Sequence, residues 1–432
     1  MDARLQRRYL QLVAGHMNTV QAIAAGVHSL PGVGTAFAAT QAAWRFLHNP
    51  RVTLPALAEP LQQLGRELAN ASPGAYALVA HDWSKLDYDT HRGKRDLRQL
   101  TQALDVGYEL ATALLVDATA GHPLAPMAVA VLAAAGVHTT ADPAVRPPQP
   151  HLDQVLPVMR AAAGWGVTKR LVHVIDREGD SARHLRAWAA GGHLFLARAD
   201  DRVVTHDSRK RKLAAVAADL AGALAAGAPR PVEVRGNKAQ QYVAEAAIVL
   251  SEPGWEELPD GKKRRVPGAP LPLRLVVAQV RDAAGAVLAE WWLLTNVGGV
   301  AAEVLAEWYY WRWRIESFHK LLKSAGLQVE EWQQETAAAI ARRLLVGCMA
   351  CVTVWRLRAQ SGPAAQACRE FLVRLSGRQM KRGVLDTAPA LLSGLHVLLA
   401  MLDALDHYGL EQLHAFARIA LPQPRPPGGS DV

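Results

Sequence analysis

Short apolar runs and amphipathic stretches alternate along most of the chain. Runs of this length that are bounded by turn residues predict buried strands. Between residue 71 and about residue 200 they occur at 76–82, 111–117, 124–132, 171–176 and 193–198. From about 200 to 297 the pattern becomes mostly β, with runs at 231–235, 242–250, 272–280 and 286–295. Residues 1–70 and 298–420 read mainly as helix, so the sequence predicts an α/β protein.

Two of the predicted strands end in an aspartate. Asp82 closes the run that begins at Tyr76, and Asp176 closes the run that begins at Leu171. Ligands of α/β proteins collect at the carboxyl ends of the strands, so both acids are candidates for a binding site. An aspartate after a strand is also commonly the N-cap of the next helix, and that alternative stays open here.

A third candidate acid lies in the run WYYWRWRIESFHKLLKSAG. Tyr309, Arg312, Glu316 and Lys323 are offset by three, seven and fourteen residues. At roughly 100° per helical residue they fall within about 60° of one another on a single predicted helix. The apolar residues that gather on another side of this helix are Trp311, Ile315, Phe318 and Leu322. The alternative is an ordinary surface ion pair between Arg312 and Glu316.

Asp82, Asp176 and Glu316 together predict a pocket of three carboxylates. Oxygen ligands of this kind suit Mg²⁺ or Mn²⁺. Two such ions about 3.5–4 Å apart can clamp the attacking and leaving oxygens of a phosphodiester during cleavage. The pattern therefore favours a metal-dependent enzyme that acts on a nucleic-acid backbone.

Four stretches give the chain its resemblance to the DDE transposases of the bacterial insertion-sequence-four group, the Tn-five-like enzymes. Tyr309, Arg312, Glu316 and Lys323 match the Y-R-E-K signature of this group at every spacing. The segments that resemble the motifs around the second aspartate, the first aspartate and part of the DNA-binding domain are 176–180, 81–84 and 43–50.

The resemblance implies an organisation into three parts. Residues 1–70 would form a helical DNA-binding domain. Residues 71–360 would form an RNase H-like catalytic domain, interrupted by a β-rich insertion at about 200–297. Residues 361–432 would form a helical C-terminal dimerisation region with a disordered tail. A helical cap on the catalytic domain is the alternative for this last part.

The resemblance also implies roles for individual side chains. Tyr309, Arg312 and Lys323 would grip phosphates beside the cut. The other residues that would contact DNA are Arg198, Trp291, Arg45, Arg342 and Arg343. For Trp291 the implied role is stacking on a flipped base, and its neighbour Trp292 or a place in the core are the alternatives.

The function implied is cut-and-paste transposition. Asp82, Asp176 and Glu316 would hold two Mg²⁺ or Mn²⁺ ions, and the enzyme would cleave the element ends and join the 3′-OH to target DNA. Its partners would be the terminal inverted repeats, the target DNA and a second copy of the chain. A DNA-binding protein derived from a transposase but without cleavage activity, and an RNase H-like nuclease without strand transfer, are the alternatives.

Composition agrees with a polyanionic partner. The 432 residues carry a formal net charge of +9, and the calculated pI is about 9.6. Such a balance favours binding to nucleic acid. The alternative is a basic, arginine-rich protein from a GC-rich genome.

Cysteine usage and apolar runs indicate the compartment. The three cysteines offer no second metal-binding pair beside Cys348 and Cys351, so both are expected to be core thiols. The run from Leu124 to Val137 contains Pro126 and is too short for a membrane span. We therefore expect a cytoplasmic, nucleoid-associated bacterial protein that does not contact a membrane.

Overall fold

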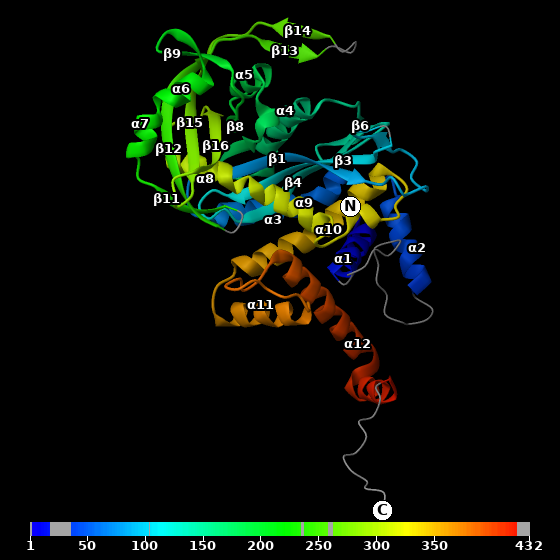
Figure 1. Ribbon diagram of the computed structural model, residues 1–432. Helices are drawn as coiled ribbons and strands as arrows, with labels where there is room; N and C mark the ends of the chain where they lie inside the picture. The colour runs from blue at the N-terminus through cyan, green and yellow to red at the C-terminus, as the bar shows by residue number, and fades with distance from the viewer. Residues whose placement is uncertain (1, 18–35, 103, 235–236, 258–261, 421–432) are drawn as a thin grey trace, which may run out of the picture.

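A computed structural model describes residues 2–17, 36–102, 104–234, 237–257 and 262–420. In this part of the chain a large mixed sheet lies at the centre, and helices lie at both ends of the sequence (Figure 1). The predicted α/β class is therefore confirmed. The break predicted at Pro31–Gly34 and the tail after residue 420 lie outside the described residues.

Fourteen strands of the described chain form the main sheet. Along its path the order is β10-β9-β12-β15-β16-β8-β7-β1-β3-β4-β5-β6, with β2 paired to β3 and β11 to β12. The strands are β1 (Tyr76–Asp87), β2 (Arg98–Gln99), β3 (Val106–Asp117), β4 (Pro123–Ala133), β5 (Gly136–Thr139), β6 (Asp142–Arg146), β7 (Arg170–Ile175), β8 (Leu194–Arg198), β9 (Val203–His206), β10 (Arg209–Lys212), β11 (Arg230–Val234), β12 (Asn237–Leu250), β15 (Leu271–Arg281) and β16 (Val287–Thr295).

The five strands predicted between residue 71 and about residue 200 are confirmed as β1, β3, β4, β7 and β8. β1 runs parallel to β7 and antiparallel to β3, and β7 runs parallel to β8. The segment before residue 151 contains the edge strand β6. Pro143 is tolerated there because an edge strand leaves one row of backbone groups unpaired.

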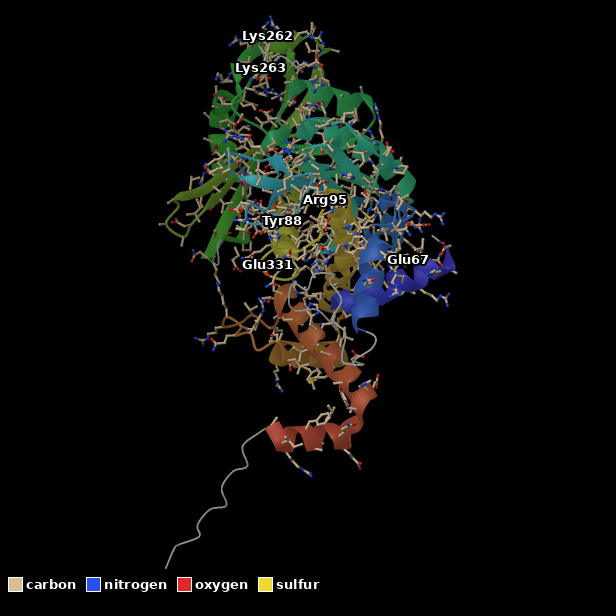
Figure 2. All side chains as sticks on the ribbon, turned by 90° about the vertical axis from the view of Figure 1, so that its right-hand side faces the viewer. Glu67, Tyr88, Arg95, Lys262, Lys263 and Glu331 are labelled. Carbon is tan, nitrogen blue, oxygen red and sulfur yellow. The ribbon has the colours of Figure 1, made fainter. Side chains whose placement is uncertain are left out.

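The β-rich segment adds one half of the sheet. Its four predicted strands are confirmed as β11, β12, β15 and β16, and β16 joins β8. A separate hairpin is formed by β13 (Gly254–Glu257) and β14 (Lys263–Val266). Two clusters of basic residues, at 209–212 and 262–265, lie on β10 and on this hairpin. Figure 2 shows Lys262 and Lys263 at the hairpin end of the molecule, far from α12.

Helices cover both faces of the sheet (Figure 1). On one face lie α4 (His151–Ala162) and α5 (Ala182–Ala190), and α4 begins within a residue of the predicted start. On the other face lie α3 (Leu54–Ala71) and α10 (Ala337–Ala359), which both pack against β4. The smaller helical segments are η1 (Ala163–Trp165), η2 (Arg177–Gly179), α6 (Leu213–Asp219), α7 (Ala221–Ala226) and η3 (Val329–Glu331).

The predicted helix through Tyr309 and Lys323 is two helices. α8 (Ala302–Trp311) and α9 (Trp313–Leu322) meet at Arg312. Backbone hydrogen bonds there join residues three apart in the sequence, as in a 3-10 helix, in place of the four of an α-helix. Lys323 has left helical geometry, at φ −88° and ψ −122°. The predicted apolar side is confirmed, since Ile315, Phe318 and Leu322 are all buried.

The N-terminal helices α1 (Ala3–Met17) and α2 (Ala36–Leu47) pack against α10. The chain then ends in α11 (Pro363–Leu375) and α12 (Ala388–Ala420), and α12 projects away from the body (Figure 1). Cys348 and Cys351 are free and buried in α10, as predicted for core thiols.

Two helices of the described chain, α10 and α12, are long and apolar enough to cross a membrane by length and composition. In the most apolar stretch of α10, 78% is buried inside the protein, as in a core helix, against 28% in α12.

Candidate active site

The strand register brings Asp82 and Asp176 to the same level of the sheet. His81 is the register partner of Ile175 across the parallel pair β1 and β7, and the two aspartates directly follow them. Side chains alternate along a strand, so Asp82 points to the face opposite His81. Its partner on β3 is Thr112, whose hydroxyl bonds His319 of α9 at 2.7 Å. Asp82 and α9 therefore share one face.

Glu316 reaches this face from α9. The guanidinium of Arg312 lies between two of the acids, 2.8 Å from Oε1 of Glu316 and 3.7 Å from Oδ2 of Asp82. Arg312 is only 7% exposed, whereas the Glu316 side chain is 39% exposed. The predicted ion pair between Arg312 and Glu316 is thus present, and it also holds Asp82. We call Asp82, Asp176 and Glu316 the acid cluster.

Asp176 also has the structural role that was weighed against ligation. Its Oδ1 accepts a hydrogen bond of 2.9 Å from the backbone NH of Glu178 and caps η2. Oδ1 of Asp82 likewise accepts from the backbone NH of Trp83 at 2.9 Å. Each aspartate therefore uses one oxygen to fix its own orientation, which preorganises the carboxylates.

The electrostatics of Asp82 are those of a crowded carboxylate. Burial is the largest of the influences that raise the pKa of Asp82 to about 6. The charges of Asp176 and Glu316 raise it too, while Arg312 and the backbone NH of Trp83 oppose them. The three acids are thus close enough to repel one another, and nearby positive charge stabilises them.

Tyr309, Arg198 and Trp291 lie behind the acid cluster. Burial raises the pKa of Tyr309, Asp176 raises it further, and Arg312 and Arg198 lower it, so these groups surround one phenol. Tyr309 is 2% exposed and packs on Trp291, with ring centroids 5.7 Å apart. Trp291 is itself 8% exposed, which agrees with the alternative that it belongs to the hydrophobic core. The side chain of Tyr309, for which a phosphate contact was predicted, is therefore buried, and Arg198 beside it is half-buried.

Lys323 is engaged by the protein. Its Nζ donates to the carbonyl oxygen of Lys85 at 2.7 Å and pairs with Glu330 at 2.8 Å. Lys323 therefore connects the end of α9 to β1. Because α9 ends at Leu322, the helical spacing that would place Lys323 on the same side as Glu316 does not extend to Lys323.

Two arginines predicted to contact DNA make contacts within the protein. Arg342 donates to the carbonyl oxygens of Val52 at 2.7 Å and Leu47 at 3.0 Å. Arg343 is 2% exposed, donates to Gln334, and lies 4.0 Å from the ring centroid of Trp332. Burial lowers the pKa of Arg343 to about 9. Arg343 is therefore enclosed by the protein, and Arg342 binds α2 and the turn that follows, while the DNA contacts of both stay predictions.

Arg45 lies apart from the acid cluster, on a basic face of the N-terminal helices. It is exposed and bonds Gln41 at 3.1 Å. A cleft of about 510 Å³ brings it together with other arginines from α1 and from the turn after α2, which are Arg4, Arg7, Arg8 and Arg51. The arginines of this basic face therefore come from α1, from α2 and from the turn after α2.

The acid cluster offers oxygen donors of the kind that Mg²⁺ and Mn²⁺ prefer. Asp176 and Glu316 both raise the pKa of Asp82, which places negative charge of all three acids in one region. In the described residues, however, no three His, Cys, Asp or Glu side chains stand together as a ready metal-ligand set. Arg312 fills the space between Asp82 and Glu316, so ligation requires Glu316 to change rotamer, which its exposure permits. The donor chemistry therefore suits such ions, whereas the acids as placed do not form a metal site.

Sequence reasoning missed His151, at the start of α4. Its Nε2 lies 2.7 Å from Glu109 of β3, and its Nδ1 lies 2.8 Å from Glu178 of η2. Burial lowers its pKa, but the hydrogen bonds and charges of both glutamates outweigh this and raise the pKa to about 9. The partners lie far apart in the sequence, so no local pattern could have indicated them.

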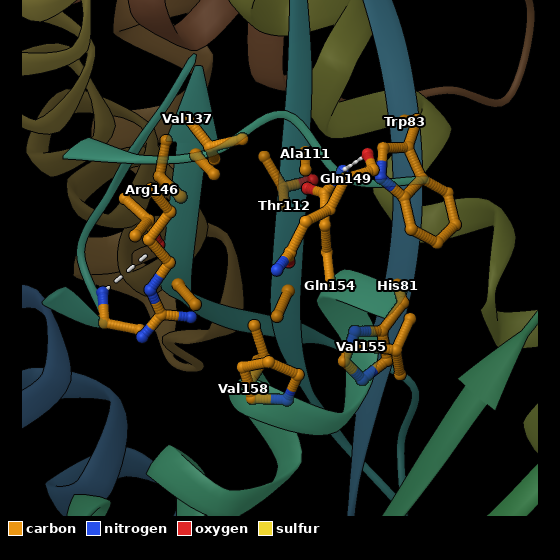
Figure 3. Close-up of a pocket in the computed structure, with 17 residues that line it drawn as sticks. His81, Trp83, Ala111, Thr112, Val137, Arg146, Gln149, Gln154, Val155 and Val158 are labelled. Atoms are coloured by element: carbon orange, nitrogen blue, oxygen red, sulfur yellow. Dashed lines mark hydrogen bonds between the residues drawn. The ribbon is translucent and has the colours of Figure 1, made fainter. Parts of the chain in front are cut away.

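The opposite face of the sheet contains a small apolar cavity of about 40 Å³ (Figure 3). His81 and Trp83 of β1 and Val155 and Val158 of α4 line it. His81 bonds the buried His173 of β7 at 2.8 Å, and burial lowers the pKa of His81 to about 3. This pair joins the strands beneath the acid cluster but does not face it.

Comparisons of this sequence with models of known protein families and with curated proteins find no match.

Proposed function

We propose that the chain is a cut-and-paste DNA transposase of the DDE class, built on an RNase H-like core. The observation that carries this proposal is the acid cluster, three carboxylates from β1, the end of β7 and α9, two of which pair with the guanidinium of Arg312. The strand order β4-β3-β1-β7-β8, antiparallel on one side of β1 and parallel on the other, supports the RNase H-like core.

Asp82, Asp176 and Glu316 would hold two divalent ions. When bound, such ions lower the pKa of a water molecule and stabilise the leaving oxygen of a phosphodiester. Asp82 and Asp176 are held in place by backbone NH groups, and Glu316 provides the mobile ligand. Arg312 keeps the carboxylates charged and is the nearest donor for a phosphate once Glu316 turns away.

The remaining parts of the molecule have roles in this proposal. The basic face around Arg45 would hold duplex DNA by its phosphates, in a salt-dependent manner. The exposed apolar residues of α12, including Met401, Leu402 and Leu405, would contact a second copy of the chain. The DNA substrate would place the protein in the cytoplasm with the nucleoid.

The test uses a plasmid that carries the DNA flanking the gene for this chain on both sides. Incubation with the protein and Mg²⁺ or Mn²⁺ should release the intervening segment and join its 3′ ends to a second plasmid. Sequencing of the products should show joining at one fixed pair of ends. Binding without nicking would favour a transposase-derived DNA-binding protein, and nicking without joining would favour a nuclease.

A further inference from the structure

A second basic feature lies on the flank of α9, away from the acid cluster. A cleft of about 750 Å³ runs between α9 and the segment that joins α11 to α12. The start of β4 and Trp355 of α10 close it below. We call it the loop trough. It shares Arg314 and Ser317 with a neighbouring cleft of about 720 Å³ beside Trp291 and Trp313, so the two clefts form one path along α9.

The loop trough is lined by positive charge alone. Its charged lining residues are Arg314, Lys320, Arg358, Arg378 and Lys381, and no Asp or Glu is among the described residues that line it. Lys320 and Lys381 are exposed, and neither pairs with an acid of the described chain. Lys320 and Lys381 are therefore cations whose charge a bound polyanion would balance.

The rest of the lining is largely apolar. It includes Leu321, Trp355, Met380 and Val384. A DNA duplex presents mainly phosphates and sugars, which gain little from such a surface. A single strand presents phosphates and also the faces of its bases, and proteins that bind single strands combine cationic grooves with aromatic side chains on which the bases stack, as Trp355 is placed to do here.

The wall of the trough is held in position by the protein. Asp386 binds Arg358 at 2.7 Å and Arg369 at 3.1 Å, and so fixes the segment to α10 and α11. Arg378 donates to the carbonyl oxygen of Ala325 at 3.3 Å and fixes the other end to the turn after α9. A preformed groove binds its ligand without paying to order a loop.

We propose that the loop trough binds single-stranded DNA, with phosphates on its cations and bases on its apolar floor. Lys320 is one helical turn from Glu316, so it connects the edge of the trough with the side of α9 that carries Glu316. That this strand belongs to the DNA cut at the acid cluster rests on the proposed function, whereas the binding of a strand does not.

The test measures binding of a fluorescein-labelled oligodeoxythymidine of about 15 nucleotides to the full chain by anisotropy. Lys381→Glu should raise the dissociation constant about tenfold and lower the slope of log affinity against log salt by about 0.7 or more. Lys320→Ala should act in the same direction. The matched control is Arg382→Glu, the same charge change at the next residue, which does not line the trough, and it should change the constant less than about twofold.

Three outcomes overturn the proposal: no binding of the oligonucleotide by the wild type, equal weakening by Arg382→Glu, or tighter binding of a duplex that Lys381→Glu weakens as strongly. Asp82→Asn separates the two proposals. It should abolish cleavage and leave oligonucleotide binding unchanged, so failure of the transposase proposal would appear in cleavage and failure of the trough in binding.

Discussion

The imidazole of His151 lies flat on the indole of Trp83, with ring centroids 4.7 Å apart and an interplanar angle of 5°. Trp83 follows Asp82, and Glu178, which bonds the same imidazole, is two residues after Asp176. One side chain of α4 therefore connects the segments that carry two acids of the cluster.

The His151 contacts predict a pH-dependent contribution to stability. The folded pKa of about 9 lies above the ordinary value of 6.5, so the contribution is complete below pH 6.5 and is lost as pH rises through 9. The melting temperature of His151→Gln should lie furthest below the wild type at acidic pH, and the gap should narrow toward pH 9. A gap that is the same at every pH, or equal to that of the exposed control His122→Gln, would contradict this.

Arg342 should stabilise the fold and not bind DNA. Arg342→Ala removes the charged donor to Leu47 and Val52, and the free energy of unfolding should fall by about 2 kcal/mol in urea titrations. The control is Arg356→Ala, on the exposed side of the same helix, which should change little. If Arg342→Ala lost DNA affinity without losing stability, the result would contradict this prediction and support a DNA contact of Arg342.

The strands could be predicted from the sequence because each is an apolar run bounded by turn residues, as in β1 and β7. The two aspartates could be predicted because they end such runs. The partners of charged residues could not be predicted, because Arg342, Arg343 and Lys323 look like free cations until the fold brings carbonyls, an aromatic ring and Glu330 to them.

The prediction of one regular helix through Tyr309 and Lys323 was the other error. The Y-R-E-K offsets suit a continuous helix, but the chain tightens at Arg312 and leaves the helix at Lys323. Nothing in the local sequence, such as a proline, marks the break. The break turns Arg312 toward both Asp82 and Glu316, so the deviation from regular geometry lies where the acids meet.

The basic face of the N-terminal helices should contribute phosphate contacts. The double change Arg4→Ala with Arg45→Ala should weaken binding of a DNA duplex and lower the salt slope by about 2, since each lost contact accounts for roughly 0.9. Exposed cations elsewhere, changed as Arg92→Ala with Lys238→Ala, serve as the control. An unchanged slope in the first pair would remove this face from the DNA interface.

The charged carboxylate of Asp82 should lower the stability of the folded protein. Burial and neighbouring carboxylates raise its pKa from 3.8 to about 6, so the folded state loses stability as pH rises between these values, and above pH 6 Asp82 carries its charge at the full cost. Asp82→Asn should therefore melt at or above the wild-type temperature at pH 8. Differential scanning calorimetry would measure this, and a clearly lower melting temperature would mean that the attraction of Arg312 outweighs the penalty.

Nicking of supercoiled plasmid DNA is the most direct test of the acid cluster. The wild type should nick in Mg²⁺ or Mn²⁺ and not in EDTA, and Asp82→Asn, Asp176→Asn and Glu316→Gln should each abolish nicking while remaining folded. Asp87→Asn, at the exposed end of the same strand β1, should nick like the wild type. Nicking that survives any one of the three changes, or a wild type that never nicks, would contradict a three-carboxylate active site.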